Sequence, residues 1–397
     1  MTVKQSGLKN PLVELVDLSH EEKSARGLLH TPTEIVQQPT SWQETYSRIS
    51  REKENLQKFL NPILASSPTV YLIGAGTSDY IGRALASILR QQWQCDVIAV
   101  PSTELITNME SYVLPNRPYL WISFSRSGDS SEGVGVLEMA MRKYPHVHHL
   151  VVSCNQYGKM SELCAGQSSA YVLLLADAVN DRGLAMTSSF TNMVLAGHCL
   201  AHLRSLDQYK PILESLVRMG NEILQQAPAI AENASRLHCR KACFVGTGAM
   251  AAAATESSLK CLELTAGAIS AFSESTMGLR HGPMSALDAE TLIVTFISAD
   301  ERRRKFELDL LKEIFEKQLG RVRIAVAPAD VDLHNLADHL IALTSAPDIP
   351  DDYRVPVDVI LGQLIGLFSS LDHGLKPDAP SPSGVISRVV SHVHIYH

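Results

Sequence analysis

Residues 69–78 read TVYLIGAGTS, and residues 241–250 repeat the same form as KACFVGTGAM. Each stretch is a short apolar run that ends in Gly-x-Gly, and each leads into a segment with helical spacing. This order is typical of a buried strand, a tight turn and a helix in an α/β protein. Because the pattern occurs twice, we predict two similar α/β lobes in tandem.

Other apolar runs alternate with longer amphipathic segments in both halves of the chain. The first half contains DVIAV, YLWISFS, HHLVVSC and YVLLL, and the second contains TLIVTFIS and VRIAVA. Such alternation indicates parallel sheets with helices on both faces. We therefore predict two flavodoxin-like, three-layer α/β/α lobes, joined by a helical segment over 192–236, with a final helix at about 356–371.

The length of 397 residues also favours more than one domain, because a single core rarely grows so large. Residues 1–66 are polar with helical spacing, so we predict an N-terminal helical arm. The remaining chain is divided into a first lobe over 67–215, a second over 216–375 and a tail over 376–397.

Composition and charge narrow the possible functions. The chain has 45% hydrophobic and 19% charged residues, as a soluble globular protein does, and we find neither a secretory leader nor an apolar run that could span a bilayer. Seven cysteines without a Cys-x-x-Cys pair indicate reduced thiols, and a net charge of −7 argues against nucleic-acid binding. We therefore expect a cytoplasmic protein that binds neither nucleic acid nor membrane.

Two predicted strand ends carry the features of a phosphate site. The loops GAGTS and SRSGDSS combine glycines with hydroxyls, and each precedes a helix whose N-terminus favours an anion. Neither is a nucleotide P-loop, so a monophosphate fits better. The alternative is that these serines merely cap helices. A dinucleotide site is disfavoured, because Asp79 replaces the third glycine of the fingerprint and GTGAMA lacks the later acidic residue.

The second half supplies candidate catalytic groups. Glu256, Lys260 and Glu263 lie at i, i+4 and i+7, which places them on one helical face. An ordinary solvated ion-pair face is the alternative, but the neighbouring residues are mostly small or apolar, which predicts an enclosed setting. Arg280 and His281 follow on a Gly-punctuated loop, where the histidine could be catalytic or merely structural.

Taken together, these motifs resemble the sugar isomerase (SIS) domain family. The resemblance rests on GAGTS, SFSRSGDSSE, LAMTSSFT and ESSLKCLELTAG followed by GLRHGP, and it covers about residues 67–390. The tandem arrangement is similar to the isomerase half of glucosamine-6-phosphate synthase. NDRGLAMTSS, LELTAGAISAF and RHGP followed by DAETLIV resemble more closely the subgroup of tagatose-6-phosphate ketose/aldose isomerases and galactosamine-6-phosphate deaminases.

The resemblance implies a role for individual residues and a homodimer without a cofactor. Its phosphate and substrate ligands would be Thr77, Ser78, Ser125, Arg126, Ser127, Ser130, Asp181 and Ala185, of which the last two lie over the sugar. Its catalytic residues would be Glu263, His281, Lys260 and Arg388. Glu263 would transfer the proton, and His281, which in the family often comes from the neighbouring subunit, would open the ring.

Two departures from the synthase shape the expected reaction. The glutaminase domain and its N-terminal cysteine are not found, so we expect no ammonia from glutamine. Arg388 stands where the synthase has an imine-forming lysine, and a guanidinium does not readily form an imine. By resemblance we expect conversion of galactosamine 6-phosphate to tagatose 6-phosphate and ammonia, with proton transfer from carbon 2 to carbon 1 by Glu263.

Three alternatives stay open from the sequence. The first is an isomerase of tagatose 6-phosphate without deamination. The second is a non-catalytic sugar-phosphate regulator, although residues 1–66 show no clear basic helix-turn-helix. A serine hydrolase is disfavoured and is not counted among the three, because Gly-x-Ser-x-Gly is not found. The third is a metal at His392, His394 and His397, but we expect an exposed terminus and no metal site.

Overall fold

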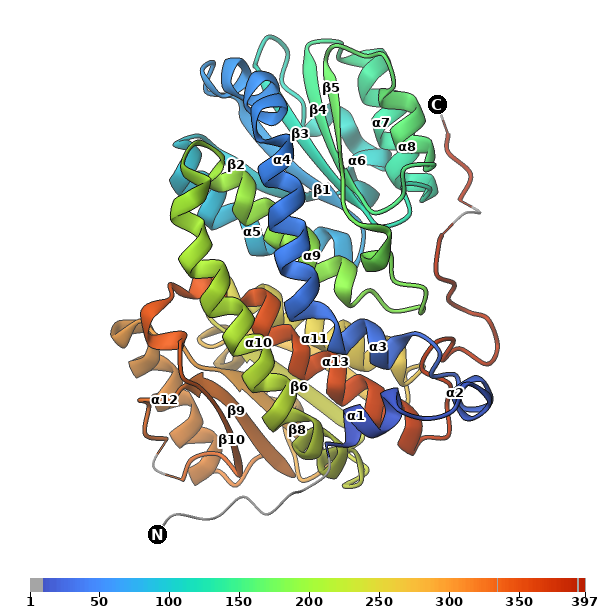
Figure 1. Cartoon of the computed structure of the whole chain (residues 1–397). Helices are drawn as coiled ribbons and strands as arrows, with labels where there is room; N and C mark the ends of the chain where they lie inside the picture. Colours follow the sequence, from blue (N-terminus) through green and yellow to red (C-terminus); the bar gives the residue numbers. More distant parts are fainter. Residues whose placement is uncertain (1–9, 334, 391–392, 397) are drawn as a thin grey trace.

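The computed structural model describes residues 10–333, 335–390 and 393–396. Within these residues the chain forms two five-stranded, fully parallel sheets of the same topology. The first sheet has the order β2-β1-β3-β4-β5, and the second, taken in the matching direction, has β7-β6-β8-β9-β10. The predicted tandem of α/β lobes is therefore confirmed (Figure 1).

The strands of both sheets are short, as buried parallel strands usually are. Their bounds are β1 (Thr69–Gly74), β2 (Val97–Pro101), β3 (Tyr119–Ser125), β4 (Val147–Ser153), β5 (Ala170–Leu174), β6 (Lys241–Gly246), β7 (Ser270–Ser275), β8 (Thr291–Phe296), β9 (Val322–Pro328) and β10 (His339–Leu343).

The helices fall into an N-terminal arm, two sets that cover the sheets, and short 3₁₀ turns. The arm has α1 (Pro11–Val16), α2 (His20–Arg26), α3 (Thr31–Val36) and α4 (Gln38–Leu64). The others are α5 (Thr77–Trp93), α6 (Ser102–Asn108), α7 (Ser131–Lys143), α8 (Lys159–Cys164), α9 (Ser188–Ala201), α10 (Leu206–Ser235), α11 (Met250–Leu264), α12 (Glu301–Glu316) and α13 (Val355–Asp372). The 3₁₀ turns are η1 (Met109–Ser111), η2 (Asp177–Val179), η3 (Leu203–Ser205), η4 (Gly278–Arg280), η5 (Pro283–Ala286), η6 (Ala346–Asp348) and η7 (Asp351–Tyr353).

The repeated Gly-x-Gly motif has the same steric cause in both lobes. A Cβ on Gly74 would lie 2.3 Å from the backbone of Ser78, and one on Gly246 would lie 2.3 Å from the backbone of Met250. Only glycine therefore lets the first turn of α5 or α11 fold back onto the end of its strand. The second glycine of each motif, Gly76 or Gly248, has a φ of +54° or +61°, which L side chains rarely adopt.

The main hydrophobic core lies between the two sheets. It includes Leu72 and Ile122 from the first sheet and Phe244 and Val294 from the second, all fully buried. Helices α5, α9, α11 and α13 fill the space between the sheets and pack on one another, while α4 and α10 run alongside them (Figure 1). Helices α6 and α7 cover the other face of the first sheet, and α12 packs on the other face of the second. The two lobes thus share one core.

Helix α13 is the most apolar helix of this core. By length and composition it could cross a membrane, but 89% of the window that meets these criteria is buried inside the protein. It also begins beside a buried ion pair, in which Arg354 donates to Asp358 over 2.9 Å. We therefore assign α13 as a core helix of the folded chain.

The structure differs from the sequence prediction at two edge strands and one junction. Strand β7 was missed because SAFSES is small, polar and only partly buried, and β10 was missed because it is a short strand at the opposite edge. The predicted continuous helix over 192–236 is broken at η3 into α9 and α10. The predicted boundary between residues 215 and 216 falls inside α10, so the division of the chain into domains stays a prediction.

The close packing of α11 on α13 gives a stability prediction. A Cβ at Gly362 would lie 2.3 Å from the Cβ of Ser257 on the facing helix. We expect Gly362→Ala to lower the free energy of unfolding by about 1–3 kcal/mol, because overpacking outweighs the roughly 1 kcal/mol gain in helix propensity. Urea denaturation measures this change.

The matched control is Ser370→Ala on the same helix. The Ser370 hydroxyl is buried without a hydrogen-bond partner among the described residues, so its removal should cost no stability. Equal stability of Gly362→Ala and the wild type would contradict the packing argument.

Candidate active site

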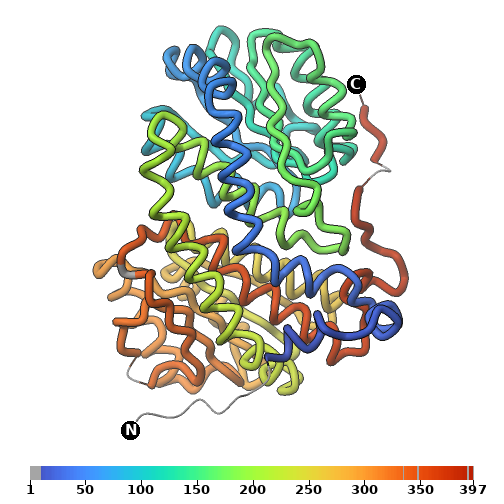
Figure 2. The backbone as a smooth tube through the Cα atoms, viewed as in Figure 1, coloured from blue at the N-terminus to red at the C-terminus, as the bar shows by residue number. Residues whose placement is uncertain are grey.

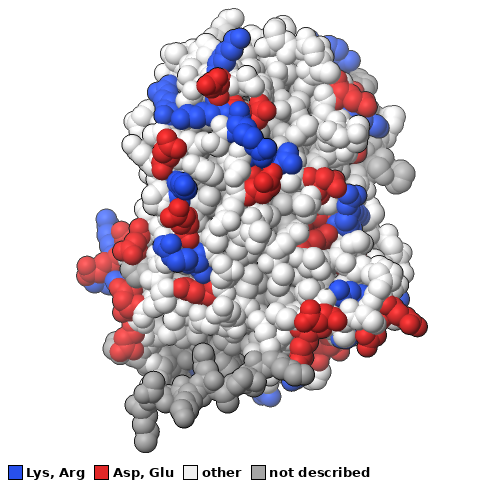
Figure 3. Space-filling view, in the orientation of Figure 1, with Lys and Arg blue, Asp and Glu red and all other residues white. Residues whose placement is uncertain are grey.

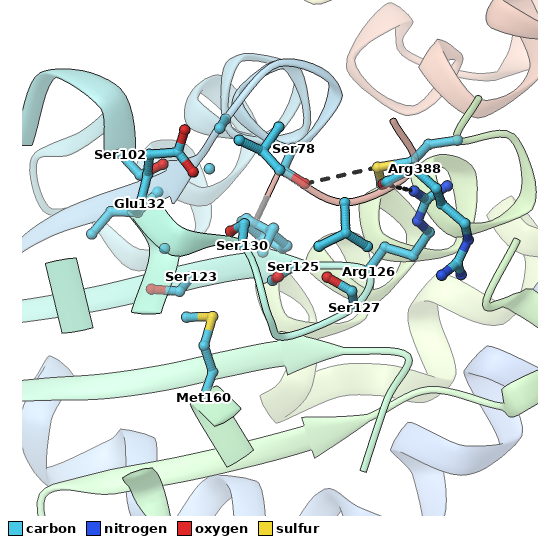
Figure 4. Close-up of a pocket in the computed structure, with 18 residues that line it drawn as sticks. Ser78, Ser102, Ser123, Ser125, Arg126, Ser127, Ser130, Glu132, Met160 and Arg388 are labelled. Carbon is cyan, nitrogen blue, oxygen red and sulfur yellow. Dashed lines mark hydrogen bonds between the residues drawn. The ribbon is translucent and has the colours of Figure 1, made fainter. Parts of the chain in front are cut away.

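Five of the predicted phosphate residues meet in one pocket at the carboxyl ends of β1 and β3, whereas Thr77 does not line it and bonds to Glu256 and Lys260. The pocket has a volume of about 150 Å³. Because β2 lies on one side of β1 and β3 on the other, the pocket occupies the point where the strand order reverses, which is where open α/β sheets bind ligands. Residues from both predicted loops and from the C-terminal tail line it, namely Ser78, Ser125, Arg126, Ser127, Ser130 and Arg388 (Figure 4).

The loop between β3 and α7 is shaped by its own hydroxyls. The Gly128 amide donates to Ser125 Oγ over 3.0 Å, and the Asp129 amide donates to Ser127 Oγ over 3.2 Å. The left-handed φ of +69° at Gly128 reverses the chain ahead of α7. The loop therefore gathers serine hydroxyls at the start of α7, where the helix dipole favours an anion, while the Ser131 amide donates to the carbonyl of Val390.

Arg126 forms the wall of the pocket and is buried. Its Nη1 donates to the carbonyl oxygens of Gly183 and Leu184 over 3.4 and 3.1 Å, and its Nη2 donates to the carbonyl of Arg388 over 2.6 Å. Burial and the nearby Arg388 lower the pKa of Arg126. Much of its hydrogen-bonding capacity is thus used by backbone carbonyls, and its predicted contact with phosphate stays a prediction.

The C-terminal tail crosses the first lobe beside this pocket. Figure 2 shows the tail leaving the second lobe near the N-terminal arm and running up along the first. Arg388 donates to the carbonyl of Asp181 over 2.8 Å from Nε and to Asn180 Oδ1 over 2.8 Å from Nη2. Val389 and Val390 line the pocket, and the Val390 carbonyl accepts from the Ser131 amide. The tail therefore forms part of the pocket rim.

The segment that the resemblance places over the sugar is anchored by Asp181. Its buried carboxylate accepts hydrogen bonds from the amides of Thr187, Ser188 and Ser189, which begin α9. Asp181 and Ala185 do not line the pocket, but Met186 does, with its sulfur 4.0 Å from Ser78 Oγ. The predicted contact of Asp181 and Ala185 with the substrate stays a prediction.

A buried chain of polar groups joins the two lobes next to the phosphate loop. Lys260 Nζ lies 2.6 Å from Glu263 Oε2, 3.3 Å from Glu256 Oε1 and 3.0 Å from Thr77 Oγ1. Glu256 and Lys260 have no exposed side-chain surface, whereas the Glu263 side chain is 24% exposed. Glu263 is thus two hydrogen bonds from Thr77, the neighbour of Ser78, and it is the ionisable member of this network with exposed surface, although it does not line the pocket.

Burial controls the charge of this chain. It raises the pKa of Glu256 to about 8, although Lys260 opposes the shift. Burial alone would lower the pKa of Lys260, but the carboxylates of Glu256 and Glu263 outweigh it and raise the pKa. Lys260 therefore stays charged, and burial drives its fully buried partner Glu256 toward the protonated form.

His281 lies outside this assembly. It is exposed at the end of η4 and does not line the pocket. The neighbouring Arg280 donates to Glu313 of α12 over 2.7 Å, which fixes the loop to the second lobe. Within one chain neither His281 nor Glu263 lines the pocket, but Glu263 is connected to Thr77 of the first loop through Lys260.

In the second lobe, protein carboxylates accept the backbone amides that follow β8. At the end of β8 the Ser298 amide donates to Glu307 Oε2 over 2.7 Å, and the Ala299 amide donates to Asp351 Oδ1 over 2.9 Å. Asp351 is also paired with Arg303 at 3.0 Å. Side-chain carboxylates thus occupy the amides at this strand end, although a cavity of about 480 Å³, lined by Thr247, Thr276 and Arg303, remains at the corresponding strand ends of the second lobe.

Sequence reasoning missed several pocket residues. Ser102, Ser123, Glu132 and Met160 also line the pocket (Figure 4). Ser102 directly follows β2 and begins α6, so its place at a strand end was a usable signal. Glu132 stands in the quoted SGDSSE motif, but an acid beside a phosphate loop gave no reason to select it. His392 and His397 lie outside the described residues, and no group of three metal-ligating side chains occurs within them.

The two lobes have one topology. The first contains a serine-lined pocket, and a buried network of charged side chains lies beside it. These features define a tandem α/β protein of the phosphosugar isomerase class. No family model matches the chain. D-galactosamine-6-phosphate deaminase AgaS of Escherichia coli is 35% identical over 378 residues, covering 92% of this chain and 95% of that protein. The chain belongs to the SIS family, in the subgroup of these AgaS proteins.

Solved structures agree with this assignment. Tagatose-6-phosphate ketose/aldose isomerase from Escherichia coli has a TM-score of 0.82 at 33% identity, covering 90% of this chain and 95% of that one. The C-terminal domain of glucosamine-fructose-6-phosphate aminotransferase from Francisella tularensis shares the fold, with a TM-score of 0.72 at 18% identity over 87% and 96% of the two chains.

The raised pKa of Glu256 predicts a pH-dependent stability. Between its ordinary value of 4.5 and the folded value of about 8, the folded chain keeps a proton that the unfolded chain releases. Stability therefore falls as pH rises through this window, by up to about 1.4 kcal/mol per pH unit for one proton. In Glu256→Gln this contribution is removed, so the difference in unfolding free energy between pH 6 and pH 8 should be smaller than in the wild type.

Urea denaturation at the two pH values measures this difference. Glu54→Gln, at an exposed position on α4, should behave as the wild type does. An unchanged pH slope in Glu256→Gln would show that Glu256 does not hold the proton.

Proposed function

We propose that the chain is a sugar-phosphate aldose-ketose isomerase and deaminase, which converts galactosamine 6-phosphate and water to tagatose 6-phosphate and ammonia. The observation that carries this proposal is the short link between the two halves of the site. Glu263 lies two hydrogen bonds from Thr77, and Thr77 adjoins the serine-lined pocket. The choice of substrate follows the names of the AgaS relatives.

The pocket would hold the phosphate and leave the sugar free to reach the second lobe. Ser78, Ser125, Ser127 and Ser130 offer hydroxyls, and the N-terminus of α7 adds the positive end of its helix dipole. A phosphate held there fixes one end of an open-chain sugar. The other end can then extend toward the partly exposed carboxylate of Glu263.

Glu263 would act as the base that moves a proton along the opened sugar. It takes the proton from carbon 2, the carbon 1 oxygen gains a proton, and the resulting enaminol is protonated at carbon 1. The product is a 2-imine, which water hydrolyses to the ketose and ammonia. Lys260 keeps Glu263 in place through its 2.6 Å contact. With a hydroxyl at carbon 2 the same transfer is a simple isomerisation.

Ring opening would require His281 from a second subunit, in a homodimer. His281 is exposed and lies outside the pocket of its own chain. The adjacent Met277 exposes 48% of its surface, as a residue covered by a partner subunit would in an isolated chain. We place this dimer in the cytoplasm, with phosphorylated sugars as its ligands and no cofactor.

A second candidate is interconversion of tagatose 6-phosphate with its aldose, without deamination. It is favoured by the similarity to the Escherichia coli tagatose-6-phosphate ketose/aldose isomerase. The same residues would serve, so only the group at carbon 2 separates the two reactions.

On the face shown in Figure 3, Lys and Arg are interspersed with Asp and Glu, so this face offers no continuous basic surface for a regulator that binds DNA.

Ammonia release from galactosamine 6-phosphate tests the proposal. The wild type should release ammonia, and Glu263→Gln should lower kcat by at least about a hundredfold with little change in substrate affinity, because the amide cannot accept the proton. Glu54→Gln should retain full activity. Ketose formation from the corresponding aldose without ammonia would select the second candidate, and substantial activity of Glu263→Gln would refute its role as the base.

Mixing two inactive variants tests the shared site. Glu263→Gln and His281→Ala are each expected to be inactive as homodimers. After mixing under conditions that exchange subunits, half of the dimers are mixed and each has one intact site, so about a quarter of wild-type activity should return. No recovery, in mixtures whose subunit exchange is confirmed by native mass spectrometry, would place both residues in one chain.

A further inference from the structure

Loop 181–184 supports both arginines of the pocket through its carbonyl groups. The Gly183 and Leu184 carbonyls accept from Arg126, and the Asp181 carbonyl accepts from Arg388. The loop lies between η2 and α9 and belongs to neither a helix nor a strand. The positions of the two guanidinium groups therefore depend on whatever holds this loop.

The N-terminal arm and the start of the tail hold the loop from its other side. Glu34 of α3 is 7% exposed, and its Oε1 accepts from the amides of Arg182 and Gly183. The Leu184 amide donates to the carbonyl of Asp378 over 3.0 Å. The Asp378 carboxylate in turn accepts from the amide and hydroxyl of Thr31, over 2.8 and 2.7 Å. Each loop amide from 182 to 184 is thus paired outside the loop.

Gly183 shows how closely these parts fit. A Cβ at this position would lie 2.8 Å from Thr31 Oγ1 and 3.0 Å from Glu34 Oε2. The backbone at Gly183 is not in the left-handed region, so the glycine is required by space and not by conformation. A side chain here would therefore require the loop, or the Thr31 and Glu34 side chains that hold it, to shift.

We propose that Glu34 is a positioning residue of the phosphate site, which acts through loop 181–184 on Arg126 and Arg388. The inference rests on the proposed function, since it assumes that these arginines serve an anionic substrate. The N-terminal arm, which does not line the pocket, would then influence substrate affinity through this loop.

The charges around Glu34 agree with a role as hydrogen-bond acceptor. Burial, followed by the nearby Asp181, raises its pKa to about 7, and Asp378 adds to the shift. The carboxyl oxygen can accept the loop amides whether or not the group carries a proton. An amide side chain should therefore replace it, whereas an apolar side chain should not.

The rate of the catalytic steps should depend on Glu34 much less than the affinity for substrate does. Glu263 and Lys260 lie on α11 of the second lobe, and they are held by Glu256 and Thr77 without any contact to the loop. A displaced loop should therefore raise KM and leave kcat nearly unchanged. A residue that only stabilises the fold would not produce this split in protein that remains folded.

The test compares Glu34→Ala, Glu34→Gln and Gly183→Ala with Glu54→Ala, an exposed control on the same arm. Turnover of galactosamine 6-phosphate and calorimetric binding of inorganic phosphate give KM, kcat and Kd. Hydrogen exchange of residues 180–187 reports the loop itself. We expect Glu34→Ala and Gly183→Ala to raise KM and Kd about tenfold or more with kcat within threefold, and Glu34→Gln to recover most of the affinity.

Three results would overturn the inference. They are unchanged KM in folded Glu34→Ala despite faster exchange of the loop, equal losses in Glu34→Gln and Glu34→Ala, and normal affinity in Gly183→Ala. If Glu34→Ala does not fold, the KM and Kd values of Gly183→Ala and Glu34→Gln decide whether Glu34 positions the phosphate site. A wild type that neither binds inorganic phosphate nor turns over the sugar would instead refute the proposed function, and the role of Glu34 would fall with it.

Discussion

The buried ammonium of Lys260 is the interaction on which the arrangement of the site depends. It joins Glu256 and Glu263 of its own helix to the Thr77 hydroxyl at the start of α5 in the other lobe. A charge with no access to water must be paired, because an unpaired buried charge costs several kcal/mol. The lobes therefore cannot separate at this point without exposing or stranding Lys260. This requirement keeps Glu263 at a fixed distance from the phosphate loop.

The two lobes share a topology, but a few side chains at their strand ends give them different functions. In the first lobe the strand ends carry small hydroxyls and leave a pocket open. In the second, Asp351 and Glu307 accept the amides at the end of β8, beside a cavity lined by Thr247, Thr276 and Arg303. One lobe can thus bind an anion while the other contributes the proton-transfer group. The N-terminal arm and the tail complete the first lobe from outside, through Glu34, Asp378 and Arg388.

The sequence allowed most of the fold to be predicted, because buried parallel strands leave long apolar runs and the Gly-x-Gly turns recur. The short edge strands β7 and β10 were lost because small or half-exposed residues give no periodic signal. Helical spacing was enough to place Glu256, Lys260 and Glu263 on one enclosed face. The roles of Glu34 and Gly183 could not be predicted, since they depend on contacts with residues about 150 positions away in the chain. The direction of the Arg126 side chain was equally beyond reach, because the carbonyls that hold it come from distant loops.

A crystal structure of the Glu263→Gln variant with galactosamine 6-phosphate tests the central claim most directly. The account predicts the phosphate among Ser78, Ser125 and Ser130, with carbon 2 of the sugar about 3–3.5 Å from the side chain at position 263. A sugar phosphate bound elsewhere, or one whose carbon 2 lies far from residue 263 of every subunit, would contradict it.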